Sequence, residues 1–304
     1  MVETKIKAHL GLLLTNLFFA INLSAVKYVT GNELIRPFGL NVVRVGACVL
    51  LFWLLFLIKP TAKKIEKKDW PRFIVCAFSG IAVNQMLFLK GLSLTFSIHA
   101  ALLMLTTPIL ITIIAGWILK EKINLFKIAG LCMGIGGAVV LVASGAGHGS
   151  GNNVLLGDVL ILINAVSYTI YFILVKPLML KYNPFQVIRW VFTLGLPMVL
   201  PFGCTELFEA NWNNFGTAGY ACIFLIVIGG TFLAYLFNIY GIKILGASVA
   251  GAYIYLQPVF ATIIAMIFLK EPLEMYKVCA ASLIFTGVFL ANKQGSNKLK
   301  DAGS

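Results

Sequence analysis

Two stretches decide the fold: PILITIIAGWILKE at residues 108–121 and PVFATIIAMIFLKE at residues 258–271. They lie 150 residues apart, and eight of their fourteen positions are identical. The identities include a proline and a Lys-Glu pair, whereas chance likeness between apolar helices would give scattered Leu and Ile matches. The chain therefore contains an internal duplication.

The same 150-residue shift aligns further positions outward from these stretches. The additional matches are Gly80 with Gly230, Gly91 with Gly241, Gly137 with Gly287, and Lys127 with Lys277. The duplication thus extends over most of the chain.

The composition indicates that this duplicated chain lies in a membrane. Of its 304 residues, 60% are hydrophobic and only 12% are charged, with a mean hydropathy of +0.94. A soluble domain carries about 25% charged residues. Ten apolar runs are long enough to cross a bilayer as helices. They are residues 8–29, 38–58, 72–92, 97–119, 126–144, 156–176, 185–202, 217–239, 246–269 and 276–292.

The distribution of lysines and arginines predicts which ends of these runs lie inside the cell. With the N-terminus inside, the inside segments hold 17 of them and the outside segments hold 5. Inside segments are enriched in Lys and Arg, so both termini are expected in the cytoplasm. This asymmetry explains most of the net charge of +13, and no nucleic-acid partner is needed to account for it.

We therefore expect an all-α integral membrane protein with two five-helix halves. The first repeat covers residues 8–144 and the second covers 156–293, joined by an external linker at 145–155 and followed by a cytoplasmic tail at 294–304. Because each half has an odd number of spans, the second half is inverted relative to the first. Inverted repeats are typical of transporters that work by alternating access.

The segments TTPILITIIAGWILKEKI (residues 106–123) and LQPVFATIIAMIFLKEPL (residues 256–273) carry a family resemblance. With the ten spans, they resemble the drug/metabolite transporter superfamily, EamA family. The resemblance implies export or exchange of small metabolites such as amino acids across a bacterial inner membrane, through a cavity shared by both halves. One departure is that the family's frequent Trp in the first and sixth spans is here Phe18 or Phe19 and Tyr168.

Polar residues inside the apolar runs are the candidate substrate-binding residues, because a polar side chain in a bilayer needs a partner or a wet cavity. A polar stripe at helical spacing marks the sixth span, and two polar residues precede Pro258 in the ninth. The full candidate set is Asn16, Asn22, Asn84, Gln85, Asn164, Ser167, Tyr168, Tyr171, Asn238, Tyr253 and Gln257. The alternative for each is interhelical hydrogen bonding.

Pro108 and Pro258 are expected in mid-helix, where a proline removes a backbone hydrogen bond and kinks the helix. Their symmetric positions predict flexing points of a gate, with a static kink as the alternative. The glutamates that follow, Glu121 and Glu271, are expected to fix helix ends.

The titratable groups within the spans are few. Arg44 could pair with an anionic group, but snorkelling to the interface is the favoured interpretation, and Arg189 has the same ambiguity. His99 is a possible proton site. Because the repeat pairs it with Val249 near a membrane end, the sequence favours a lone interfacial histidine.

Other functions receive little support from the sequence. The six cysteines are scattered singly, no metal or cofactor motif is present, and neither HExxH nor a GxSxG motif with a suitable His points to an enzyme. A carrier of lipid-linked or polyprenyl substrates is the alternative transporter, and a receptor or assembly protein is the non-transporting one. A monomer is expected, with Gly130 and Gly134 as a possible dimer face.

Overall fold

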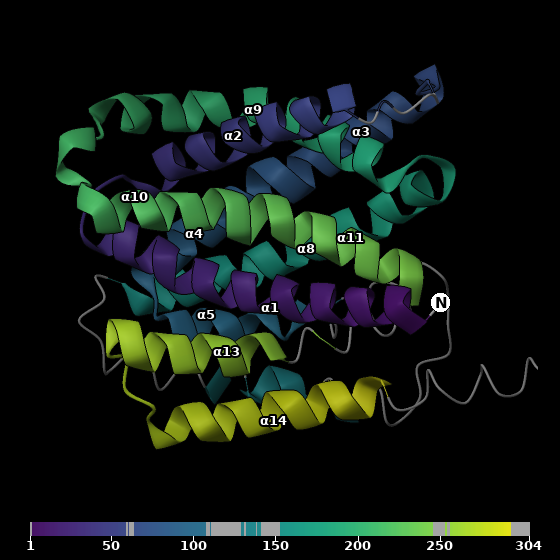
Figure 1. Ribbon diagram of the computed structural model, residues 1–304. Helices are drawn as coiled ribbons and strands as arrows, with labels where there is room; N and C mark the ends of the chain where they lie inside the picture. Colours follow the sequence, from purple (N-terminus) through teal and green to yellow (C-terminus); the bar gives the residue numbers. More distant parts are fainter. Residues whose placement is uncertain are drawn as a thin grey trace, which may run out of the picture.

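The computed structural model describes residues 2–58, 60, 64–107, 110, 129–130, 132–137, 139–140, 153–245, 253 and 256–292. Within these residues the chain is helical and contains no strand. The helices lie side by side with roughly parallel axes, with α2 and α9 at one edge of the bundle and α14 at the opposite edge (Figure 1).

The helices of the first half are interrupted by one π-helical segment. They are α1 (Val2–Gly31), α2 (Pro37–Ile58), the 3₁₀ turn η1 (Lys67–Asp69), α3 (Trp70–Ala77), the π-helix η2 (Phe78–Val83), α4 (Asn84–Leu94) and α5 (Ser97–Met104).

The described helices of the second half follow the same order. They are α8 (Val154–Lys181), α9 (Pro184–Glu209), the 3₁₀ turn η3 (Trp212–Asn214), α10 (Gly216–Phe224), the π-helix η4 (Leu225–Leu233), α11 (Ala234–Leu245), α13 (Leu256–Ile264), the π-helix η5 (Ala265–Leu269) and α14 (Met275–Asn292).

Six continuous helical stretches in the described residues are long and apolar enough to cross a membrane, and two shorter apolar helices follow them. Their outward faces are apolar: Leu50, Leu54 and Leu57 of α2 are 68%, 55% and 73% exposed. An exposed apolar stripe suits contact with lipid, while the backbone groups are satisfied within the helices.

Several predicted spans differ from the observed helices at their ends. The sixth was predicted to end at Lys176, but α8 continues through Pro177 to Lys181. The seventh was predicted to end at Phe202, but α9 continues to Glu209. This helix contains Pro197 and Pro201. Proline is tolerated inside membrane helices because neighbouring groups satisfy the freed carbonyl. About half of the predicted fourth and fifth spans lies outside the described residues.

Small residues bring the helices into close contact. At Gly39 an added methyl group would lie 2.9 Å from the backbone of Glu206 on α9, and at Gly157 of α8 it would lie 2.8 Å from the carbonyl oxygen of Gly91 on α4. Glu206 also accepts hydrogen bonds from the backbone N–H groups of Phe38 and Gly39 at 2.7 and 2.9 Å. The carboxylate caps the start of α2 and fixes it antiparallel to α9.

The π-helices η2 and η4 end at Val83 and Leu233, which are 150 residues apart. Each contains the glycine that the sequence repeat aligns, Gly80 or Gly230. A methyl group on Gly80 would lie 2.7 Å from Cγ of Tyr171, and one on Gly230 would lie 2.6 Å from Cβ of Asn22. These glycines therefore allow α8 and α1 to approach the two π-helices.

Candidate substrate site

Arg44 is buried within the bundle. It is the eighth residue of α2, about 10 Å from the start of the helix, and it is only 5% exposed. Its Nε donates a hydrogen bond of 2.6 Å to Oγ1 of Thr231 in η4. The prediction that Arg44 snorkels to the interface is wrong, because its guanidinium is held by a neighbouring helix.

Thr231 is itself held in place by the π-helix. Its hydroxyl donates to the carbonyl oxygen of Ile226, five residues earlier, at 2.9 Å. The hydroxyl oxygen that accepts from Arg44 therefore has a fixed direction. Sequence reasoning missed Thr231, although a threonine directly after two glycines in an apolar run marks a polar point on a close helix contact.

Arg44 has no carboxylate partner among the described residues. The ionisable groups that act on it are Tyr235 and Cys48, and the atom Nη1 has no hydrogen-bond partner. A buried charge is costly unless it is paired, so this guanidinium is an unbalanced cation in the bundle.

Three buried amides lie on α2 itself and on neighbouring helices. Asn41 precedes Arg44 by three residues on the same face of α2, and neither its nitrogen nor its oxygen has a partner in the described part of the chain. Asn22 lies against Gly230, and its Oδ1 is also unpartnered. Gln85 approaches the hydroxyl of Tyr235. We name these residues the Arg44 cluster: Asn22, Asn41, Arg44, Gln85, Thr231 and Tyr235.

Two predicted tyrosines border the Arg44 cluster. Tyr168 and Tyr171 of α8 interact electrostatically with Tyr235, and their rings lie 6.0 Å apart. They add aromatic side chains from another helix. One polar region inside the apolar bundle is thus formed by residues of α1, α2, α4, α8, η4 and α11.

Other predicted site residues hold helices together. Nδ2 of Asn164 donates to the carbonyl oxygen of Asn84 at 2.6 Å, and Nδ2 of Asn84 donates to that of Asn164 at 3.3 Å. Ser167 donates to the carbonyl oxygen of Ser79 at 2.8 Å. Asn16 donates to Leu12 of its own helix at 2.8 Å. The interhelical alternative describes the first three residues, which join α8 to α4 and η2.

The ninth-span residues lie elsewhere along the bundle. The hydroxyl of Tyr253 lies 2.8 Å from Nδ1 of His9 near the start of α1. His9 is 13 residues from Asn22, which places this contact about 20 Å from the Arg44 cluster along the helix. Gln257 and Pro258 are buried, and Asn238 is half-buried on α11.

Pro258 lies near the start of the described part of α13, which begins at Leu256. Pro108 lies outside the described residues. Before it, α5 ends at Met104, and the N–H groups of Leu105 and Thr106 bond three residues back, to Leu102 and Leu103. A change of helix geometry before a proline is expected, because proline disfavours the helical conformation of the residue that precedes it.

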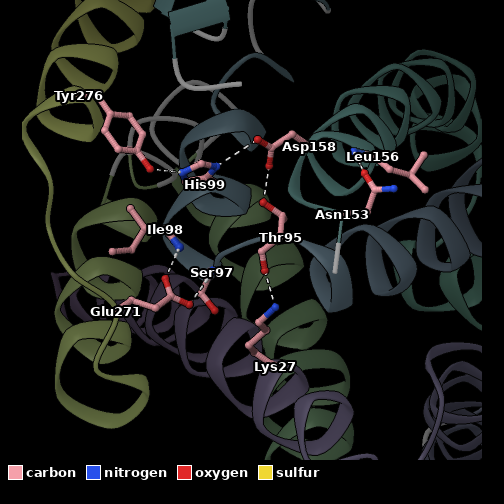
Figure 2. A network of polar contacts seen from close by, with 10 residues as sticks. All are labelled: Lys27, Thr95, Ser97, Ile98, His99, Asn153, Leu156, Asp158, Glu271 and Tyr276. Carbon is pink, nitrogen blue, oxygen red and sulfur yellow. Dashed lines mark hydrogen bonds and ion pairs between the residues drawn. The ribbon is translucent and has the colours of Figure 1, made fainter. Parts of the chain in front are cut away.

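A second polar region lies where α5, α8 and α14 begin (Figure 2). Nδ1 of His99 lies 3.0 Å from Oδ2 of Asp158, and Nε2 lies 3.1 Å from the hydroxyl of Tyr276. Thr95 donates to the other oxygen of Asp158. His99 and Asp158 are both fully buried. The prediction of a lone histidine is wrong, because His99 has two side-chain partners, whereas its place near the start of α5 agrees with the predicted position near a membrane end. We name Thr95, His99, Asp158 and Tyr276 the His99 network.

Charged groups next to the His99 network make hydrogen bonds to the ends of adjoining helices. The carboxylate of Glu271 accepts from the N–H groups of Ser97 and Ile98 at 2.9 and 3.1 Å, which caps α5. The prediction that Glu271 fixes a helix end is confirmed. Lys27 donates to carbonyl oxygens at the end of α4, including that of Thr95 (Figure 2).

The opposite end of the bundle has an exposed ionic contact. Nζ of Lys181 lies 2.5 Å from Asp69 and 2.7 Å from Glu66. The hydrogen bond from Lys181, with a second one from Lys68, lowers the pKa of the Glu66 carboxyl. This contact joins the end of α8 to the segment before α3.

Arg189 shows another way to bury a guanidinium. It is 5% exposed, and its Cζ lies 3.7 Å from the ring centre of Phe56 and 4.6 Å from that of Trp53. Aromatic faces stabilise cations through their quadrupoles. Arg189 is thus stabilised by rings of α2, whereas Arg44 is hydrogen-bonded to a threonine of η4. No group of described residues has the ligands of a metal site.

Comparison with known proteins identifies the family. The family model described as the EamA-like transporter family matches residues 6–143 and again residues 155–293. This chain belongs to the EamA-like transporter family. It is a multi-pass membrane protein with an all-α fold, as the sequence predicted.

Proteins named as transporters match most of the chain. An "Uncharacterized transporter" of Archaeoglobus fulgidus is 26% identical, over 93% of this chain and 96% of its own length. A "Probable terminal-alkyne amino-acid exporter" of Streptantibioticus cattleyicolor is 26% identical, over 80% of each chain. A solved crystal structure with 20% identity covers 96% of both chains with a TM-score of 0.62, which shows a shared fold.

Proposed function

We propose that this EamA-like protein transports small metabolites, amino acids or related compounds, by alternating access between two inverted halves. The observation that carries the proposal is the Arg44 cluster, where a buried cation and amides with unpartnered hydrogen-bonding atoms lie on adjoining helices of both halves. Such groups need a polar occupant. In a transporter family, a solute is the natural one.

The proposed architecture has ten membrane helices, five in each half, with both termini in the cytoplasm of a bacterial cell and the chain in its inner membrane. Two findings support the repeat: the family model matches once in each half, and the π-helices η2 and η4 end 150 residues apart. The distribution of lysine and arginine supports the orientation.

Within this architecture we assign the solute to the Arg44 cluster and to the neighbouring tyrosines Tyr168 and Tyr171. Tyr253 and Gln257 lie toward the start of α1 and are proposed to meet the solute on its way to the cytoplasm. Pro108 and Pro258 are proposed as the flexing points that open and close this path. We propose a monomer as the transporting unit.

The amino-acid class is supported by the chemistry of the cluster. A guanidinium and amide oxygens complement the carboxylate and ammonium of a zwitterion. The name of the Streptantibioticus relative, an amino-acid exporter, agrees with this class at 26% identity. Lipid-linked or polyprenyl substrates form the alternative, because the tyrosine wall also suits an apolar chain.

The test is uptake and counterflow in proteoliposomes, with a panel of labelled amino acids and related metabolites, with and without a pH gradient. We expect saturable flux of one chemical class and none in protein-free liposomes. Flux that follows the gradient would assign a proton to the cycle, with the His99 network as its first candidate. No flux of any solute from folded protein would contradict the proposal.

A further inference from the structure

We propose that Arg44 binds the carboxylate of the transported solute, so that the solute supplies the counter-charge that the described residues do not provide. This inference rests on the proposed function and deepens it, because it assigns the charge of the substrate and the residue that recognises it.

The first step is the charge balance of the described bundle. Its buried carboxylates are Asp158 and Glu271. Asp158 is engaged by His99 and Thr95, and Glu271 by the start of α5. Neither carboxylate forms an ion pair with Arg44. Removing a guanidinium from water costs several kcal/mol unless an anion compensates it. An incoming carboxylate provides that compensation.

The second step is the geometry of the guanidinium. Its Nε donates a hydrogen bond of 2.6 Å to Thr231, and the hydroxyl of Thr231 is itself hydrogen-bonded to a carbonyl oxygen of η4. The plane of the guanidinium is therefore held in place while Nη1 is free. A guanidinium with free N–H groups matches the two oxygens of a carboxylate better than a point charge does.

The third step concerns the amides. Oδ1 of Asn22, from α1, and Oδ1 of Asn41, from α2, are buried acceptors without partners among the described residues. A solute ammonium can donate to both. The cluster therefore matches both ends of a zwitterion, with the cation of the protein on one side and neutral acceptors on the other.

Arg189 provides the matched control. It has the same side chain and the same 5% exposure, and its Nε also has no hydrogen-bond partner among the described residues, but its guanidinium lies over the rings of Phe56 and Trp53. If burial of any arginine supported the fold and transport, both positions would respond alike. The carboxylate assignment predicts that only Arg44 responds to the charge of the solute.

The test measures thermal stabilisation of the purified full-length protein by each of the common L-amino acids and by its methyl ester. The proteins are wild type, Arg44→Lys, Arg44→Gln and Arg189→Gln. We expect at least one amino acid to stabilise wild type and Arg189→Gln, with no effect of its ester. In Arg44→Gln the apparent affinity should fall at least about 30-fold, since a buried charged partner is removed. Arg44→Lys keeps the charge and should bind with intermediate affinity.

Three results would overturn the carboxylate assignment. They are equal stabilisation by the acid and its ester, unchanged binding in a folded Arg44→Gln or Arg44→Lys protein, and stabilisation by a polyprenyl phosphate but by no amino acid. Transport separates this failure from that of the proposed function. If solute flux in proteoliposomes persists in the Arg44 variants, the protein is a transporter whose substrate is recognised elsewhere.

Discussion

The Arg44 cluster and the His99 network are both polar regions buried in an apolar bundle, yet their hydrogen bonding is opposite. Both ring nitrogens of His99 and both oxygens of Asp158 have partners from neighbouring helices. In the Arg44 cluster, one guanidinium nitrogen and the whole amide of Asn41 have no partner among the described residues. The side chains of His99 and Asp158 thus have all of their nitrogen and oxygen atoms paired, whereas the Arg44 cluster has buried atoms that are unpaired.

The difference separates a structural role from a binding role. A buried group without a hydrogen bond costs about 1–3 kcal/mol, so the Arg44 cluster destabilises the protein without solute. The His99 network instead joins α5, α8 and α14 where they begin. Changes in the two regions should therefore move the stability of the protein in opposite directions.

The largest effect is expected from Asp158→Ala. This change leaves His99 and Thr95 without their shared acceptor in a fully buried position. Leaving a buried polar group unsatisfied costs about 1–3 kcal/mol, and two groups lose their partner here. We expect a large fall in melting temperature in detergent, and a smaller one for the isosteric Asp158→Asn. Unchanged stability of Asp158→Ala would show that the network does not join these helices.

The substitution Asn41→Leu tests the Arg44 cluster. Leucine is similar in size and removes two unpartnered buried polar atoms, so we expect the free energy of unfolding to rise by about 1 kcal/mol. Solute flux should fall, because an acceptor for the solute is lost. Thermal unfolding and counterflow would be measured on the same preparation. A destabilised variant would indicate that Asn41 has a structural partner.

Tyr276→Phe removes one contact of the His99 network. The hydroxyl lies 3.1 Å from Nε2 of His99, and a typical hydrogen bond contributes about 1 kcal/mol. We expect a small fall in melting temperature with the pairing of His99 and Asp158 intact. A fall as large as that of Asp158→Ala would show that Tyr276, rather than the carboxylate, holds His99.

The smallest effect is expected at the exposed contact of Lys181 with Glu66. Lys181 lowers the pKa of the Glu66 carboxyl below its ordinary value of 4.5. The contact therefore adds stability above that value and loses it as the pH falls through the lowered pKa. The melting temperatures of wild type and Lys181→Met should differ slightly at neutral pH and converge on acidification. A difference that grows toward acidic pH would contradict this assignment.

Much of the fold could be predicted, because hydropathy and the repeat report on single helices. The positions of the described membrane helices agree with the apolar runs, but several helices extend beyond them: α1 begins at Val2, and α8, α9 and α11 end at Lys181, Glu209 and Leu245. The ends were missed because the spans were bounded by the apolar runs, whereas α8 continues to Lys181 and α9 to Glu209.

The partners of the polar residues could not be predicted. His99 and Asp158 are 59 residues apart, and Arg44 and Thr231 are 187 residues apart. Their meeting depends on which helices pack together and on how each helix is rotated. The repeat did not help, because it aligns His99 with an apolar valine. The sequence predicted which side chains are candidates, but not whether each has a hydrogen-bond partner on a neighbouring helix.

The π-helix η4 has a consequence for how such a site evolves. A π-helix bonds one residue further along the chain than an α-helix does, and each residue of an α-helix turns the chain by about 100°. The phase of α11 around its own axis is thus set by η4. Deleting one residue there would hardly alter the length or hydropathy of the span, yet it would turn Tyr235 away from Arg44. A single-codon deletion could therefore abolish or retune recognition in a protein that still inserts normally.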